Sequence, residues 1–174
     1  MVKSNIIICG ASAAGKSSLA EILANIGNAD IYEIGSIVKE KSGTSGLSAF
    51  KYVDVIFSKY GYEYFVEIFK KKHGVFHGGI IVGPRTASEV NFLKENFYPA
   101  ISIGLLTNFD LRAARHKNRI RHKESEECFE DWLMRDMAEH RWGVEEAVKS
   151  CDVVFDGGES LSEIARKILR IWGG

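Results

Sequence analysis

Eight consecutive residues near the start of the chain combine the groups that bind phosphate: Gly10-Ala11-Ser12-Ala13-Ala14-Gly15-Lys16-Ser17. Glycines let the backbone wrap closely around phosphate oxygens, where consecutive N–H groups supply positive potential. Lys16 adds a cation for the terminal phosphates, and the hydroxyl of Ser17 is placed to coordinate Mg²⁺. We therefore predict a nucleoside triphosphate site in which the segment from Gly10 to Ser18 holds the phosphates and Ser17 holds the metal.

The segments that flank this run predict the elements that position it. Residues 5–9 are mostly apolar and predict a buried strand. The apolar residues of one helix face follow the run, at Leu19, Ile22, Leu23 and Ile26. A strand, a glycine-rich loop and a helix in this order form a P-loop. A glycine turn that merely precedes an ordinary helix is the alternative, and the flanking pattern argues against it.

Four further apolar runs predict strands at residues 30–34, 79–82, 100–106 and 152–155. Helical patterns separate these runs, which is typical of a doubly wound sheet. The strands are continuously apolar, as expected for a parallel sheet that is buried on both faces. We predict one α/β domain over residues 1–174, with a five-stranded, mostly parallel sheet and helices on both faces.

Two stretches outside this framework are candidates for the rest of the site. Residues 35–73 have a helical pattern rich in Tyr and Phe, broken near Gly43 and at Gly61. We expect most of these rings in the core and one or two beside a pocket for a flat group. Residues 112–141 are dense in charge, with arginines three and four positions apart on one helix face. Such a face is commonly exposed to solvent. This one follows the carboxyl end of a predicted strand, at the edge of the sheet where ligands bind in doubly wound folds.

The composition narrows the class of protein. The 23 Lys and Arg residues balance 23 Asp and Glu residues, so a nucleic-acid-coating role is not expected. The three cysteines are widely spaced, and Cys9 and Cys151 lie in or beside apolar runs, as in a reducing compartment. The first strand begins too early for a signal peptide, and no apolar run is long enough to cross a membrane. We therefore expect a cytoplasmic protein without a membrane partner; the sequence predicts no oligomeric state.

The rest of the chain favours one class of P-loop protein. Guanine-specific proteins carry Asn-Lys-x-Asp after a strand, and the nearest segment here, residues 107–110, lacks the lysine and the spacing. The expected nucleotide is therefore ATP. A small P-loop domain with a helical insertion and an arginine-rich hairpin is typical of a phosphoryl-transfer kinase, because arginines hold the oxygens of the transferring group.

The chain also resembles known kinases at specific segments. Residues 83–86, Gly-Pro-Arg-Thr, are similar to a segment of adenylate kinases, as are residues 34–39. A closer resemblance, over nearly the whole chain, is to an archaeal P-loop family described as dephospho-CoA-kinase-like or adenylate-kinase-like. This resemblance is carried by residues 82–90, 127–129, 135–136, 142–143 and 150–161.

On the nucleotide side, the resemblance implies that residues 10–18 hold the donor phosphates and the metal. Arg115 would stack on adenine. Asp156, Gly157 and Gly158 would form the loop at the edge of the base.

On the transfer side, the resemblance implies that Arg85 holds the acceptor phosphate. Residues 35–73 become the acceptor-binding insertion and residues 112–141 the arginine-rich lid. Lys16 would act on the transferring group with three arginines that close over it, Arg119, Arg121 and Arg135. A charged surface without a catalytic role is the alternative for these arginines.

Two departures from the family pattern concern carboxylates. Val82 stands where an acidic residue usually orients Mg²⁺, and Ser36 replaces the Asp that usually opens the acceptor helix. Glu33 would supply a substitute carboxylate, unless it is simply the charged end of a strand.

The sequence thus favours ATP- and Mg²⁺-dependent phosphoryl transfer to a small-molecule phosphate acceptor, a nucleoside monophosphate or dephospho-CoA. The missing carboxylates support an alternative, a non-catalytic ATP-binding regulatory protein. A weaker alternative is a polynucleotide 5′-kinase that uses the basic hairpin, and the zero net charge counts against it.

Overall fold

Five parallel strands form the centre of the structure, a computed structural model that describes residues 3–122 and 127–172. The strand order is β2-β3-β1-β4-β5, and Ile8 of the central strand lies opposite Val82 and Ile103. The strands are β1 (Asn5–Gly10), β2 (Ile31–Glu33), β3 (Ile80–Val82), β4 (Ala100–Leu106) and β5 (Val153–Asp156). This arrangement confirms the predicted doubly wound sheet and shows that every pairing in it is parallel.

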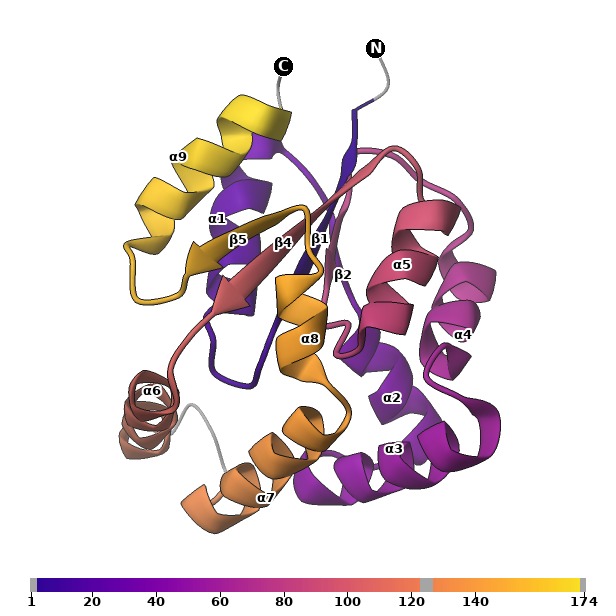
Figure 1. Cartoon of the computed structure of the whole chain (residues 1–174), viewed down its shortest axis with the longest axis vertical. Coiled ribbons are helices and arrows are strands. Elements are labelled where there is room, and N and C mark those ends of the chain that lie inside the picture. The colour runs from indigo at the N-terminus through magenta and orange to yellow at the C-terminus, as the bar shows by residue number, and fades with distance from the viewer. Residues whose placement is uncertain (1–2, 123–126, 173–174) are drawn as a thin grey trace.

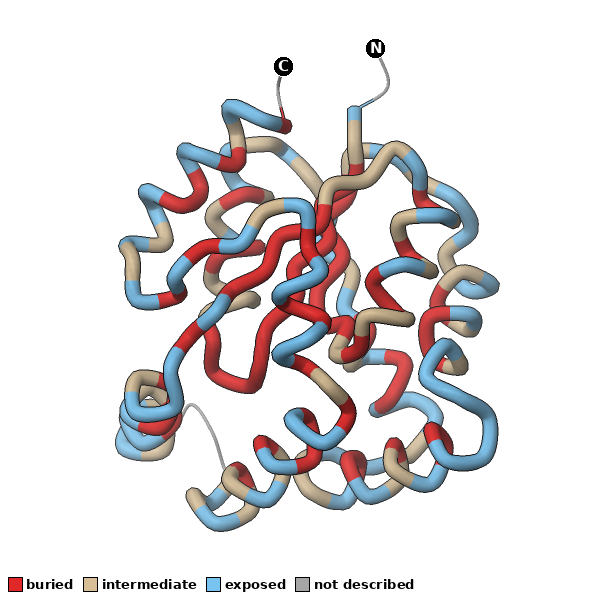
Figure 2. The backbone as a smooth tube through the Cα atoms, viewed as in Figure 1, coloured by how far each residue is buried: buried red, intermediate tan, exposed pale blue. Residues whose placement is uncertain are grey.

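Helices cover both faces of the sheet, because successive side chains of a strand point to opposite sides. On one face, Ile6 and Ile8 pack with α1 (Lys16–Gly27) and α9 (Leu161–Trp172). On the other, Cys9 packs with α5 (Ala87–Asn96) and α8 (Val144–Lys149). Figure 1 shows the two helix layers on either side of the strands. Figure 2 shows that buried residues follow the strands and the inward sides of these helices.

The helical insertion forms three helices on the Ile7 side of the sheet, α2 (Ile34–Ser42), α3 (Gly46–Tyr60) and α4 (Tyr64–His73). Their boundaries confirm the predicted breaks at Gly43 and Gly61. Phenylalanines of the insertion are buried, as expected, whereas Tyr60 and Tyr62 are exposed. The ring hydroxyls explain this difference, since burial would oblige each of them to find a hydrogen-bond partner.

The charge-dense stretch forms α6 (Phe109–Arg121) and α7 (Phe129–Arg141), which lie beyond the carboxyl ends of the strands (Figure 1). Residues 123–126 of the predicted lid lie outside the described part of the chain. Trp132 on α7 is fully buried against Ala13 and Ala113. The two helices are therefore packed onto the P-loop rather than standing free of it.

Two local predictions were wrong in detail. The second strand ends at Glu33 rather than residue 34, because Ile34 begins α2 and thereby buries its side chain beside Ile37. Ile26 was expected to face the core but is 60% exposed. In the last turn of α1 the Trp172 ring packs against Gly27 instead. The approach is so close that an added Cβ on Gly27 would lie 2.5 Å from the ring.

Cys9 and Cys151 are buried as predicted, Cys128 is exposed, and all three are free thiols. Among the residues that the structure describes, no helix is both long and apolar enough to cross a membrane.

Candidate functional site

The backbone of the P-loop is shaped to expose amide groups at the start of α1. Gly15 has a φ of 108°, a left-handed conformation that glycine adopts without steric cost. Ala13 also has a positive φ, of 61°, which side chains rarely adopt. These two turns lead the chain from β1 into α1, so the amides at the helix N-terminus face a phosphate-sized space.

The side chain of Lys16 folds back onto its own loop. Its Nζ donates a hydrogen bond of 2.8 Å to the carbonyl oxygen of Ala11. Desolvation lowers the pKa of Lys16 from 10.5 to about 8, and the charge of Glu139 opposes this shift. The ammonium can leave a carbonyl for a phosphate at little cost, because a charged acceptor forms the stronger hydrogen bond.

The phosphate cavity, of about 180 Å³, lies between the P-loop, the ends of β2 and β3, α6 and α7. It brings together most of the residues predicted to act on the phosphates: Ser12, Ala13, Lys16, Ser17, Arg85, Arg119 and Arg135. Glu33, Val82 and Glu139 also line it. Arg121 is exposed at the end of α6 and is not part of this lining, because the last turn of the helix points it elsewhere.

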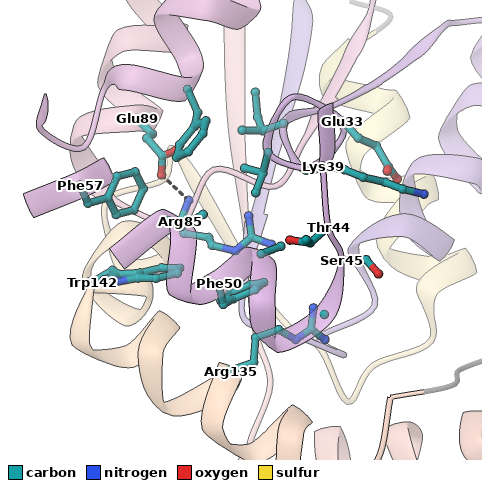
Figure 3. Close-up of a pocket in the computed structure, with 17 residues that line it drawn as sticks. Glu33, Lys39, Thr44, Ser45, Phe50, Phe57, Arg85, Glu89, Arg135 and Trp142 are labelled. Carbon is teal, nitrogen blue, oxygen red and sulfur yellow. Dashed lines mark hydrogen bonds between the residues drawn. The ribbon is translucent and has the colours of Figure 1, made fainter. Parts of the chain in front are cut away.

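A second cavity, the insertion pocket of about 250 Å³, opens beside the phosphate cavity. Its apolar wall includes Phe50, Phe57 and Trp142 (Figure 3). The guanidinium groups of Arg85 and Arg135 lie 5.1 and 5.0 Å from the Phe50 ring centre. Figure 3 shows the two arginines above and below that ring. Both cavities share Glu33, Gly35, Arg85 and Arg135, so a molecule in the insertion pocket would meet the phosphate cavity at these residues.

Arg112 does not act with the other arginines of α6. Its guanidinium is buried in an ion pair with Asp136 of α7, and it also donates to the carbonyl oxygens of Thr107 and Ser12. Arg115, one turn later, instead contacts the P-loop residue Ala14 and Gly157, in the predicted base-edge loop. Helical spacing places these arginines on one face of α6, but the structure gives them different roles. Arg112 is a structural residue, and the others are candidates for ligand binding.

Arg115 joins the P-loop to the predicted base-edge loop. Its two terminal nitrogens donate to the carbonyl oxygens of Ala14, at 2.9 Å, and Gly157, at 2.7 Å. A Cβ on Gly157 would lie 1.7 Å from the Thr107 hydroxyl, so only glycine fits there. Next to Arg115, a cavity of about 270 Å³ opens between Gly15, Ser18, Asn118, Arg119, His122 and Leu161.

The other two residues of the predicted base-edge loop lie at the surface after β5. Asp156 is exposed and accepts a hydrogen bond of 2.8 Å from the backbone N–H of Gly158. This bond shapes the turn that carries Gly157, so the loop segment is preformed next to Arg115.

Glu139 is the site residue that motif analysis missed. It is 1% exposed, and its two carboxylate oxygens accept hydrogen bonds from the Ser12 amide and from Arg85. Burial tends to raise the pKa of Glu139, but the charges of Arg85 and Lys16 outweigh it and hold the pKa below its ordinary value. The only available signal was its position one helical turn after Arg135, which places the two side chains on the same face.

Oxygen donors suited to Mg²⁺ are present in the phosphate cavity. Ser17 and Glu33 both line it, and Mg²⁺ is commonly held by one or two such oxygen-bearing side chains together with phosphates and water. Val82 contributes no ligand atom. Within the described ranges no cluster of three His, Cys, Asp or Glu residues could hold a metal ion.

Solved structures share this architecture over more than nine-tenths of their length. A shikimate kinase from Aquifex aeolicus vf5 has 19% identity, covers 98% of this chain and 99% of its own, and gives a TM-score of 0.57. A shikimate kinase from Acinetobacter baumannii, in complex with shikimate, has 16% identity, coverages of 97% and 92% and a TM-score of 0.62. A gluconokinase from Sinorhizobium meliloti 1021 has 16% identity, coverages of 99% and 95% and a TM-score of 0.64. The chain has the fold of a P-loop kinase.

The chain matches no protein-family model and no curated protein sequence. At these identities the likeness shows the predicted fold alone. It gives no support to the dephospho-CoA-kinase-like or adenylate-kinase-like family, since the three structures named above are two shikimate kinases and a gluconokinase.

The pKa of Lys16 leads to a prediction for nucleotide binding. Because this pKa is about 8, the ammonium loses its proton as the pH rises from 7 to 9, and a cation for phosphate is lost. We expect the Kd for ATP, measured by calorimetry, to rise about tenfold over this range. In Lys16→Met the Kd should be higher throughout and flat with pH. A wild-type Kd that does not change between pH 7 and 9 would contradict the prediction.

Proposed function

We propose that this protein is an ATP-dependent kinase that transfers the γ-phosphoryl group to a small molecule bound in the insertion pocket. One observation carries the proposal: the phosphate cavity at the P-loop and the insertion pocket meet at the same pair of arginines, Arg85 and Arg135. A donor phosphate and an acceptor would therefore approach each other beside two cations. Positioning and charge stabilisation of this kind supply most of the catalysis in phosphoryl transfer.

Different residues bind the transferring group and the metal in the proposed reaction. An acceptor oxygen forms a bond to the γ-phosphorus while the bond from that phosphorus to the β–γ bridging oxygen breaks, and ADP leaves. Lys16, Arg119 and Arg135 surround the transferring group and balance its charge. Ser17 and Glu33 would hold Mg²⁺, which neutralises phosphate charge when bound.

The insertion pocket favours an acceptor with an anionic group and a flat apolar part. Arg85 and Arg135 stand at its mouth, and its wall carries Phe50, Phe57 and Trp142. Some hydroxyl groups of a polyhydroxylated acid such as shikimate or gluconate could pair with Lys39, Thr44 or Ser45. Those that face the rings would stay unpaired, which is costly. We therefore favour a nucleoside monophosphate or dephospho-CoA, in which a phosphate meets the arginines and a base meets the rings.

The test is ADP release from ATP and Mg²⁺ with a panel of acceptors. The panel holds each nucleoside monophosphate, dephospho-CoA, shikimate, gluconate and a short oligonucleotide with a 5′-hydroxyl group. We expect stimulation by a nucleoside monophosphate or by dephospho-CoA, and its loss in Lys16→Met. Stimulation by shikimate or gluconate alone would contradict the acceptor class but not the kinase. Tight ATP binding without stimulation by any acceptor would favour the regulatory alternative.

The aromatic wall makes a prediction about the acceptor alone. Phe57→Leu keeps an apolar side chain in the core but removes a flat ring from the insertion pocket. We expect the KM for the acceptor to rise about five- to tenfold, because an aromatic contact is worth about 1 kcal/mol. The KM for ATP should stay unchanged. The matched control is Phe69→Leu, a buried ring that does not line the pocket, and an equal rise there would refute the assignment.

A further inference from the structure

A single buried carboxylate joins the two halves of the proposed site. Glu139 Oε2 accepts a hydrogen bond of 2.7 Å from the backbone N–H of Ser12, in the P-loop. Its Oε1 accepts one of 2.8 Å from Nε of Arg85, at the border with the insertion pocket. The side chain is 1% exposed, so water does not compete for either bond.

The position of this carboxylate is unfavourable for phosphate binding taken alone. Glu139 lines the phosphate cavity, where its negative charge repels an incoming phosphate. Both of its oxygens are already engaged, which argues against direct contact with a ligand. A repelling group at such a place suggests a benefit that outweighs the repulsion. Its charge favours the protonated form of Lys16, and its two oxygens make the hydrogen bonds to Ser12 and Arg85.

The rest of α7 reinforces the same connection. Arg135, one turn before Glu139, donates from Nη2 to the Ser12 hydroxyl at 2.9 Å. Trp132, one turn earlier again, donates from its indole nitrogen to the same hydroxyl at 3.2 Å. Three successive turns of α7 therefore hold Ser12, and only the Glu139 turn also holds Arg85.

We propose that Glu139 is a positioning residue that couples the P-loop to Arg85, so that nucleotide affinity depends on the state of the acceptor-side arginine. This role rests on the proposed function, in which Arg85 serves the acceptor. A group that binds Arg85 competes with Glu139 for its guanidinium and weakens that hydrogen bond. The Glu139 carboxylate then shifts, and its hydrogen bond to the Ser12 amide changes with it. Such a link is reciprocal, because coupling between two sites acts equally in both directions.

The test measures ADP affinity, since ADP lacks the γ-phosphate, the group that faces the acceptor in the proposed reaction. The Kd for ADP with Mg²⁺ is measured by calorimetry for wild type, Glu139→Gln, Arg85→Gln and the double variant. Glu139→Gln should weaken ADP binding about tenfold, although the loss of a repelling charge alone would tighten it. Arg85→Gln should weaken it several-fold, and the double variant should lie within about twofold of Glu139→Gln.

Two further variants keep the result interpretable. Glu139→Asp keeps the charge but is too short to bridge both partners, so it should also weaken ADP binding; it replaces Glu139→Gln if that variant does not fold. Glu130→Gln, an exposed carboxylate on the same helix, should leave the Kd unchanged. Thermal unfolding of each sample shows that binding is measured on folded protein.

Several outcomes would overturn the role. These are unchanged or tighter ADP binding in Glu139→Gln, an unchanged Kd in Glu139→Asp, or single effects that multiply in the double variant. If wild type binds no ADP, the proposed function fails and this role fails with it. If the binding cycle behaves as expected while no acceptor is phosphorylated, the coupling stands and the kinase assignment falls.

Discussion

Lys16→Met is expected to lower kcat by at least about 10²- to 10³-fold with the acceptor that the panel identifies. Lys16 lines the phosphate cavity with Arg119 and Arg135, where charge would develop during the proposed transfer. Methionine has a similar length and leaves the loop packed, but it supplies no cation. Its effect is therefore larger than that of a surface charge, because the lost interaction is made in a site partly shielded from water.

Steady-state ADP release at saturating ATP and acceptor measures this change. Lys59→Met, an exposed lysine at the end of α3, is the matched control and should keep wild-type kcat. A Lys16→Met protein with wild-type kcat would refute the assignment of the phosphate cavity. If wild type itself shows no turnover, and the variant loses only ATP binding, the protein is the regulatory alternative.

Asp136→Ala is expected to lower the free energy of unfolding by about 3–5 kcal/mol. Asp136 and Arg112 are both buried, and their ion pair joins α7 to α6 beside the P-loop. Removal of the carboxylate leaves the guanidinium of Arg112 buried without its counter-charge. An uncompensated buried charge costs more than the ion pair contributes, so the loss exceeds that of an ordinary surface pair.

Urea denaturation followed by circular dichroism measures this loss. The double variant Arg112→Met with Asp136→Leu should recover part of the stability, because apolar side chains often replace a buried ion pair without loss. The carbonyl oxygens of Thr107 and Ser12 lose their donor in this variant, so the recovery is incomplete. Glu130→Ala, an exposed change on the same helix, should alter stability by less than about 0.5 kcal/mol. If Asp136→Ala and the double variant lose equal free energy of unfolding, the loss comes from altered packing rather than from the unpaired charge.

Local patterns predicted most of the framework, because each depends on residues close together in the chain. The strand expected at residues 100–106 is β4, Ala100–Leu106. Gly43 ends α2 with a φ of 65°, which side chains rarely adopt, so the break there was readable from one residue. The same holds for the P-loop, whose glycines and lysine are adjacent in sequence.

The arginines of α6 show where such patterns stop. Arg112, Arg115 and Arg119 have equivalent spacing, yet each meets a different neighbour in the fold. The first is buried against Asp136, the second holds the carbonyl oxygens of Ala14 and Gly157, and the third lines the phosphate cavity. Helical spacing predicts a shared face, but it cannot predict which element covers each turn of that face.

By itself, then, the sequence determined the glycine-rich loop between β1 and α1, the strands of the sheet and the helical insertion beside it. Only the tertiary structure decided that Arg85 and Arg135 border two cavities and that Glu139 links the P-loop to Arg85. Glu139 and Ser12 are 127 positions apart, and Glu139 and Arg85 are 54 apart. Contacts over such separations arise from how α7 packs across the strand ends, and no local pattern records that packing.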